Sequence, residues 1–299
     1  MSKKVKNVAP AGEEEDLLKQ TSLWKDSWRR LKKNKLAMLG LIIILILIFC
    51  TVFAGVLTPY DYAKQDLANK FLYPSLKHPF GTDNYGRDIL TRVLYGGRIS
   101  LLVSVSAVAM ALIVGGFIGA LAAYVGGFFE NVIMRLFDII MAIPNFLLAV
   151  TVQAALGTGI QNAAIAIAIG TMPTMARIMR SAVLTVKDQE FVEAARAVGS
   201  GHLRIIMVHL IPNTFATVIV NATLMLGAAI LTISGLSFIG LGVAPPAPEW
   251  GSILSAGRQF IRDFWPIVTF PGLAIMATLF GFNLLGDGLR DALDPKLKQ

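Results

Sequence analysis

The sequence predicts an all-α membrane protein with six transmembrane helices, and three observations support this class. Of its 299 residues, 55% are hydrophobic and only 15% are charged, so polar side chains cannot cover the surface of a soluble globule of this size. The mean hydropathy is +0.64. The apolar runs recur at lengths near the ~20 residues that a helix needs to cross ~30 Å of hydrocarbon, which favours helices over a barrel.

Residues 1–36 are predicted to form a cytoplasmic tail that ends in an interfacial amphipathic helix. The acidic run Glu13 to Asp16 lies in a segment that we expect to be disordered. The basic, Trp-bearing segment Trp24 to Lys33 is typical of a helix at the inner membrane surface. Ten of the 27 Lys and Arg residues precede the first apolar run, which indicates a topology signal rather than a nucleic-acid-binding patch.

The first span is predicted at 37–57, as an uncleaved signal anchor, because the preceding segment is too long and polar for a secretory leader. This run contains Cys50, the chain's one cysteine, so no disulfide framework and no thiolate metal site is expected.

An extracytoplasmic loop is predicted at 58–98. Gly81 and Gly86 indicate turns, and a helix is expected to start at Asp88. The charged residues Asp83, Arg87 and Asp88 allow a metal or anion site, but a buried structural ion pair is the favoured interpretation.

A permease core domain is predicted at 99–289, followed by a cytoplasmic tail at 290–299. Its five expected spans cover about 99–124, 131–153, 160–183, 214–242 and 265–285. Small residues every four positions in the second span predict a groove for another helix: Gly115, Gly119, Ala123 and Gly127.

The third and fourth spans contain Pro144 and Pro173, which are expected to kink them. Asp138 in the third span allows a proton relay. A local ion pair with Arg135, one turn away, is the favoured alternative.

A water-exposed loop is predicted at 184–213, because it carries more charge than a spanning helix accepts. The pattern indicates a helix from Glu190 to Val198, a left-handed cap at Gly199 and a second helix capped by Ser200 and limited by Pro212. Apolar positions at helical spacing give each half one apolar face: Phe191, Ala194, Ala195 and Val198, then Leu203, Ile206 and Leu210.

The central loop resembles the EAA loop of the membrane subunits of ABC importers. Glu193-Ala194-Ala195, then Gly199 and Leu210-Ile211-Pro212, carry this resemblance, with small departures at His209 and Ile211. It implies that this loop contains the coupling helix that docks on an ATPase subunit. The residues assigned to coupling on this basis are Glu193, Ala194, Ala195, Gly199, Ser200, His202, Leu203 and Pro212.

Other segments resemble the second, C-type, membrane subunit of the dipeptide, oligopeptide and nickel ABC importers. They are 81–98, 236–251 and 283–295, and the resemblance extends over about 24–296. It implies the type I ABC importer fold, and as partners a second homologous permease, two ATPase subunits, an extracytoplasmic solute-binding protein and membrane lipid. No cofactor is expected on this chain, since ATP and Mg belong to the ATPases and the sequence has no phosphate-binding Gly-x-x-x-x-Gly-Lys loop.

The expected cargo is a dipeptide or oligopeptide, with nickel or a metallophore as the alternative. Four uncharged polar residues are candidates for the substrate pathway: Gln153, Asn162, Asn221 and Asn283. A secondary transporter and an intramembrane enzyme are disfavoured, because the halves do not mirror each other and no catalytic group or metal ligand set appears at one depth. The distribution of Lys and Arg predicts both termini and the central loop in the cytoplasm, and the resemblance implies the cytoplasmic membrane of a bacterium or archaeon.

Overall fold

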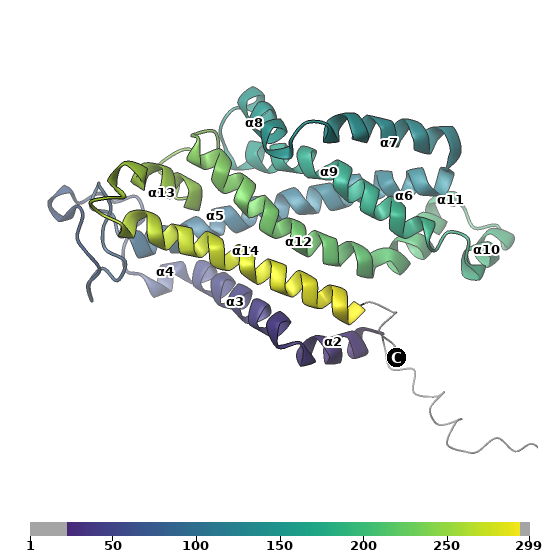
Figure 1. The fold of residues 1–299 in the computed structure, drawn as a ribbon, viewed down its shortest axis with the longest axis horizontal. Coiled ribbons are helices and arrows are strands. Elements are labelled where there is room, and N and C mark those ends of the chain that lie inside the picture. The colour runs from purple at the N-terminus through teal and green to yellow at the C-terminus, as the bar shows by residue number, and fades with distance from the viewer. Residues whose placement is uncertain (1–22, 294–299) are drawn as a thin grey trace, which may run out of the picture.

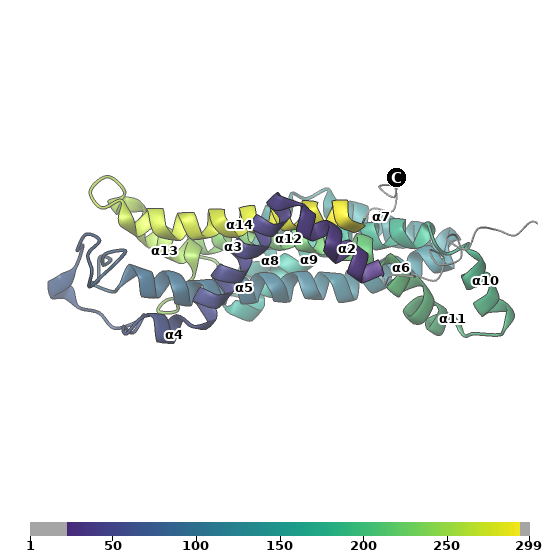
Figure 2. The same ribbon diagram turned by 90° about the horizontal axis from the view of Figure 1, so that it is seen from below.

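The computed structural model describes residues 23–293. Within this range all the regular elements are helical, and the long helices run along the long axis of the molecule (Figure 1). The loop before α5 and helix α13 lie at one end of the bundle, and α10 and α11 lie at the other (Figures 1 and 2). The predicted disordered acidic run at 13–16 and the basic C-terminal residues lie outside the described part.

The N-terminal helices pack against the last helix of the chain. Helix α2 (Leu23–Lys33) precedes α3 (Lys35–Val52) and the short α4 (Ala54–Leu57). Asn34 caps α3 by accepting hydrogen bonds from the backbone N–H groups of Leu36 and Ala37. Gly40 of α3 lies against the backbone of Gly281, where a Cβ atom would be 2.7 Å from the carbonyl oxygen. This close approach of small residues holds α3 along α14.

The second predicted span is part of a longer helix that begins before the apolar run. A 3₁₀ turn, η1 (Leu67–Asn69), lies in the preceding loop. Helix α5 (Ile89–Met110) starts at Asp88 as predicted, with Asp88 as its cap, and continues through a π-helical segment, η2 (Ala111–Gly115), into α6 (Gly116–Val125). The predicted small-residue groove is confirmed at Gly115 and Gly119, which lie against the backbone of α9. Gly127 does not belong to it, since a Cβ there would meet nothing within 4 Å.

The prediction that the third span is one kinked helix is wrong. The chain forms α7 (Gly127–Met141) and α8 (Asn145–Leu156), which meet at an angle of 87°. Pro144 has no N–H to continue the ladder of hydrogen bonds and disfavours helical backbone at the residue before it, so the helix ends instead of bending. No side chain of α7 is buried in this chain.

Helix α9 (Ile160–Leu184) contains Pro173 and supplies much of the main hydrophobic core. It packs against α5, α6, α8 and α12. After the loop come α10 (Glu190–Ala197), α11 (His202–Arg204), a π-helical segment η3 (Ile205–Leu210) and α12 (Ile211–Phe238).

Pro212 does not limit the second loop helix, contrary to the prediction. The helix that starts at His202 runs unbroken into the span, with Pro212 at the first turn of α12. The π-helical segment just before it changes the hydrogen-bonding register, which accommodates a residue that cannot donate to the preceding turn.

The chain closes with α13 (Trp250–Gly257), the 3₁₀ turn η4 (Arg258–Phe260) and α14 (Pro266–Leu293). Four helical stretches of the described part are long and apolar enough to cross a membrane, and a fifth results if α7 and α8 form one broken span. Helix α9 is the sixth element expected to cross. It has 25 residues and enough length, but its polar residues and proline make it less apolar.

Candidate coupling site

The hairpin from Glu190 to Arg204 projects from one end of the bundle (Figures 1 and 2). Gly199 has a φ angle of +77°, which confirms the predicted left-handed cap. The N–H of Ser200 donates to the carbonyl of Ala195, and that of Gly199 donates to Arg196, both at 3.0 Å. These two bonds form a Schellman motif. Ser200 does not cap the second helix; Gly201 occupies that position, and no side chain caps it.

The hairpin buries only part of the predicted apolar face, at Ala195, Ile206 and Leu210. Val192 and Ala195 are buried against the same core cluster as Ile205 and Ile206. In contrast, Val198 is 81% exposed and Leu203 is 61% exposed. The spacing correctly predicted amphipathic helices, but it could not show which apolar residues the chain covers itself. The uncovered ones, Val198 and Leu203, flank the turn and face away from the core of this chain.

The predicted coupling residues are gathered on this hairpin, with Pro212 two turns further along. Ala194, Gly199, His202 and Pro212 are exposed, whereas Ala195 is buried. Glu193 is exposed and lies in the first turn of α10, where the helix dipole favours a carboxylate. Within residues 23–293 no Lys, Arg or His lies within 4.0 Å of its carboxylate.

Tyr124, near the end of α6, contacts both halves of the hairpin, and sequence reasoning missed it. Its hydroxyl lies 2.8 Å from Nδ1 of His202. The guanidinium of Arg196 lies over its ring, 5.6 Å from the centroid. The ammonium of Lys187 donates to the carbonyl of Ala123 at 3.3 Å. The one available signal was an aromatic residue at the end of the second apolar run.

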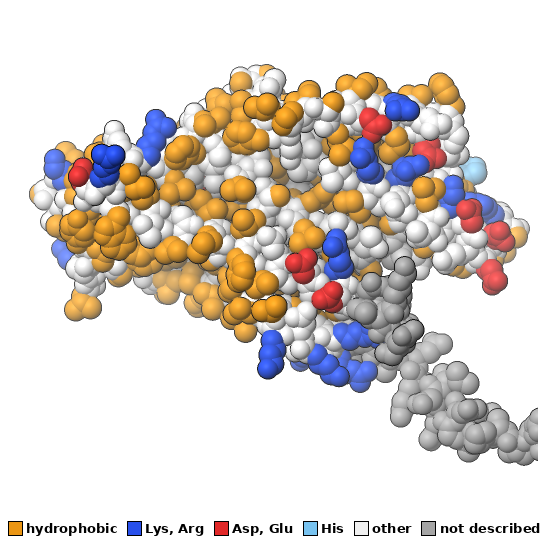
Figure 3. Space-filling model, in the orientation of Figure 1, with side chains coloured by type: hydrophobic (Ala, Val, Ile, Leu, Met, Phe, Trp, Pro, Cys, Tyr) orange, Lys and Arg blue, Asp and Glu red, His pale blue; other side chains and the backbone are white. Residues whose placement is uncertain are grey.

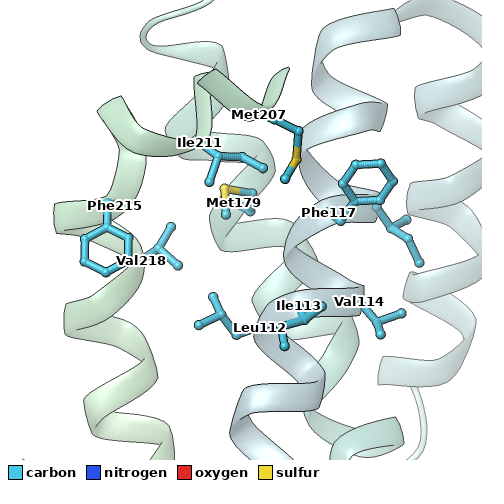
Figure 4. A pocket seen from close by; sticks show the side chains of 10 residues that line it. Leu112, Ile113, Val114, Phe117, Met179, Met207, Ile211, Phe215 and Val218 are labelled. Atoms are coloured by element: carbon cyan, nitrogen blue, oxygen red, sulfur yellow. The ribbon is translucent and has the colours of Figure 1, made fainter. Parts of the chain in front are cut away.

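An apolar cavity of about 480 Å³ lies next to the hairpin (Figure 4). It opens between the η2–α6 segment, which contributes Ile113 and Phe117, and the η3–α12 segment, which contributes Met207 and Phe215. Met179 of α9 also lines it. Because all its lining side chains are apolar, this cavity offers polar cargo no side-chain hydrogen bonds.

The four predicted pathway residues do not form one cluster. Gln153 and Asn162 lie together, since both side-chain amides donate to the carbonyl of Gly157, at 2.7 and 3.2 Å. They fasten the turn between α8 and α9. Asn221 donates within its own helix, to the carbonyl of Thr217. Asn283 is exposed on α14.

The buried ion pair predicted before α5 is confirmed. Nε of Arg87 lies 2.7 Å from Oδ2 of Asp83. Asp88 instead pairs with His78 at 3.0 Å and accepts from the N–H of Thr91 at 2.7 Å, which caps α5. No group of three His, Cys, Asp or Glu side chains within the described residues could hold a metal ion.

The predicted local pair of Asp138 with Arg135 is only part of the arrangement. The closer partner of Asp138 is Arg177 of α9, at 2.6 Å, and Arg135 lies 3.9 Å away. Arg180 of α9 also pairs with Glu130, so two ion pairs join α7 to α9. Charged groups are visible in this part of the surface, among apolar side chains (Figure 3).

Glu249 is a buried ionisable residue that the sequence analysis did not single out. It is fully buried, caps α13 through the N–H of Ser252 at 3.0 Å, and accepts from the hydroxyl of Ser100 of α5 at 2.9 Å. Burial raises the pKa of Glu249 above its usual range, although hydrogen bonds from Ser237, Gly251, Ser100 and Ser252 act in the opposite direction.

The long apolar helices, the projecting charged hairpin and the buried polar loop at the opposite end define a multi-span membrane transport component. Comparison with known proteins agrees. The family model of the binding-protein-dependent transport system inner membrane component matches residues 113–299, and that of the N-terminal transmembrane domain of oligopeptide transport permease C matches residues 22–78. The chain belongs to this family of inner membrane transport components.

Relatives align over nearly the whole chain. The dipeptide transport system permease protein DppC of Alkalihalophilus pseudofirmus is 49% identical, over 95% of this chain and 93% of its own length. The glutathione transport system permease protein GsiD of Escherichia coli is 43% identical, over 92% and 91%. Among solved structures, the inward-facing methionine ABC transporter MetNI matches with a TM-score of 0.55 and 18% identity, over 68% of this chain and 96% of that chain. That likeness shows a shared fold.

Proposed function

We propose that this chain is one of two transmembrane subunits that form the pathway of an ATP-driven peptide importer, with both termini and the 184–213 loop in the cytoplasm. The projecting hairpin is the observation that carries the proposal. It exposes Val198, Leu203 and Glu193. Large apolar side chains exposed among charged ones on a projecting element are typical of a surface that a protein partner covers.

The relatives support a peptide as cargo. DppC is described as a dipeptide permease and GsiD as a glutathione permease, so peptides of two or three residues are the proposed substrate class. The apolar cavity beside the hairpin is not the proposed route, because it would leave the polar groups of a peptide unpaired. Asn221 and Asn283 remain proposed pathway residues, whereas Gln153 and Asn162 fasten a turn.

The chain is proposed to bind no nucleotide itself. Its partners would then be a homologous permease, two ATPase subunits that carry ATP and Mg, and an extracytoplasmic solute-binding protein. The hairpin would dock on an ATPase, with Ala194 and Gly199 where the two surfaces come closest.

Uptake by the reconstituted complex tests the proposal. Proteoliposomes with all partner subunits, ATP inside and loaded binding protein outside should accumulate a labelled dipeptide. The same vesicles without ATP, or with nickel in place of the peptide, should not accumulate cargo. ATP-dependent nickel uptake without dipeptide uptake would overturn the cargo assignment.

Cysteine labelling at Ser200 in intact cells tests the orientation, because reaction with an impermeant reagent would place the hairpin outside.

A further inference from the structure

Tyr124 makes contacts that the end of a helix does not itself require. It lies on α6, near the end of the 37-residue helical stretch that begins at Ile89, and it is half-buried. Its ring and its hydroxyl contact different halves of the hairpin. Arg196, in α10, stacks on the ring, and His202, in α11, meets the hydroxyl. One side chain therefore contacts both helices on either side of the Gly199 turn.

The contacts around Tyr124 connect the hairpin to a span that is not its sequence neighbour. Along the chain, the hairpin follows α9 and leads into α12. The α5–α6 stretch meets it through apolar packing in the main core cluster and through two polar contacts among the described residues: Tyr124 with His202, and Lys187, just before the hairpin, with the carbonyl of Ala123. A movement of the hairpin reaches α9 and α12 through the backbone, but reaches the C-terminal end of α6 through side-chain contacts.

We propose that Tyr124 is the positioning residue that transmits movement of the hairpin to the α5–α6 stretch. This inference rests on the proposed function, since it assumes that an ATPase moves the hairpin. The hydroxyl–imidazole bond and the cation–π contact hold the hairpin and α6 as one body. Without them, the hairpin still docks and still moves α9 and α12, but α6 follows it less closely, through its packing on α9.

Three variants in the reconstituted complex separate the two contacts. Tyr124→Phe removes the bond to His202 and keeps the ring under Arg196. Tyr124→Leu removes both. Tyr95→Leu is the matched control, because Tyr95 lies on the same long helix at its other end and its ring also carries an arginine, Arg98, 4.6 Å from the centroid. Each variant is assayed for ATPase co-purification, basal ATP hydrolysis, stimulation by loaded binding protein and dipeptide uptake.

We expect normal co-purification and basal hydrolysis in all three variants. Stimulation and uptake should fall by about two- to tenfold in Tyr124→Phe, as for the loss of one hydrogen bond, and further in Tyr124→Leu, with more ATP hydrolysed per peptide. His202→Phe combined with Tyr124→Phe should be no worse than the stronger single variant, since both remove the same bond.

Two results would overturn the inference. One is wild-type stimulation and uptake in Tyr124→Leu. The other is a loss of ATPase co-purification as large as the loss of stimulation, since Tyr124 would then only shape the docking surface. Failure of the wild-type complex to take up dipeptide is a separate outcome, which removes the proposed function itself.

Discussion

Arg177 of α9 donates to Asp138 of α7 across 2.6 Å, and this pair joins the outermost helix of the chain to its central one. Helix α7 buries no side chain of its own, so its position depends on this pair, on Glu130 with Arg180, and on its connections. The two side chains of the first pair are 45% and 52% exposed in this chain. Water weakens such a pair, and its expected contribution is about 0.5 kcal/mol.

Exchanging the two charges tests this contact. Asp138→Asn and Arg177→Gln should each lower the thermal midpoint of the purified protein by a small amount. The double exchange Asp138→Arg with Arg177→Asp should recover part of the loss. Arg135→Gln is the control and should have almost no effect, because Arg135 lies 3.9 Å from Asp138 and is 85% exposed. An equal effect of Arg135→Gln would contradict this assignment of partners.

Gly199→Ala should destabilise the hairpin without any steric clash. A Cβ atom at this position meets nothing within 4 Å, but the φ angle of +77° costs about 1 kcal/mol for a residue with a side chain. Gly201→Ala is the matched control, since it also has open space and its φ angle is −63°. Proteolysis of the hairpin should be several times faster in the first variant only. Equal rates would mean that the turn is not under conformational constraint.

Glu193→Ala should reduce coupling to the ATPase more than it reduces protein stability. The carboxylate is exposed and unpaired among the described residues, so a basic or hydrogen-donating group on the ATPase is its expected partner, with a contribution of about 1.5 to 3 kcal/mol. Stimulation by loaded binding protein should fall sharply in Glu193→Ala and partly in Glu193→Gln, with no new pH dependence. Glu190→Ala, an exposed residue in the same first turn, serves as the control. Normal stimulation in Glu193→Ala would remove this carboxylate from the mechanism.

Glu249 should make the stability of the protein depend on pH. Its raised pKa means that the folded state binds the proton more tightly than the unfolded chain, where the pKa of glutamate is about 4.3. The stabilisation is complete below that unfolded value and is lost as the pH rises through the folded one. The thermal midpoint in detergent should therefore fall with rising pH over this window.

Glu249→Gln should flatten this dependence. Its carbonyl can still accept from Ser252 and its amide can donate to the hydroxyl of Ser100. Glu249→Ala should also flatten it, and loss of the cap should make this variant about 1 kcal/mol less stable than Glu249→Gln. The same pH slope in wild-type protein and Glu249→Gln would show that another group causes it.

Local backbone requirements could be predicted from the sequence, and long-range partners could not. Gly199 was predicted as a left-handed cap because that conformation selects glycine, and Asp88 as the start of α5 because the helix dipole favours an acidic residue in the first turn. Asp138 has partners both three residues away and 39 residues away, and helical spacing shows only the first. Tyr124 was missed for the same reason, since His202 and Arg196 are remote in the chain.

The effects of proline depended on context that the sequence does not contain. Pro144 ends α7 with an 87° turn, Pro173 lies inside α9, and Pro212 follows a π-helical segment within an unbroken helix. The residue is the same in each case, and the packing around the helix determines the outcome. Helix α9 was predicted as a span although it is less apolar than the others, and a helix surrounded by other helices needs no uniformly apolar surface.

The two uninterrupted stretches Ile89–Val125 and His202–Phe238 have a mechanical consequence. At 1.5 Å per residue, 37 residues extend over about 55 Å, whereas the hydrocarbon layer is about 30 Å thick. Each stretch is therefore a stiff rod that extends well beyond the membrane core, and the hairpin is attached to the tip of the second rod without a flexible joint. A rod that pivots near its middle moves its two tips in opposite directions by similar amounts. A displacement at His202 then becomes a displacement at Phe238, on the opposite side of the membrane, by leverage alone.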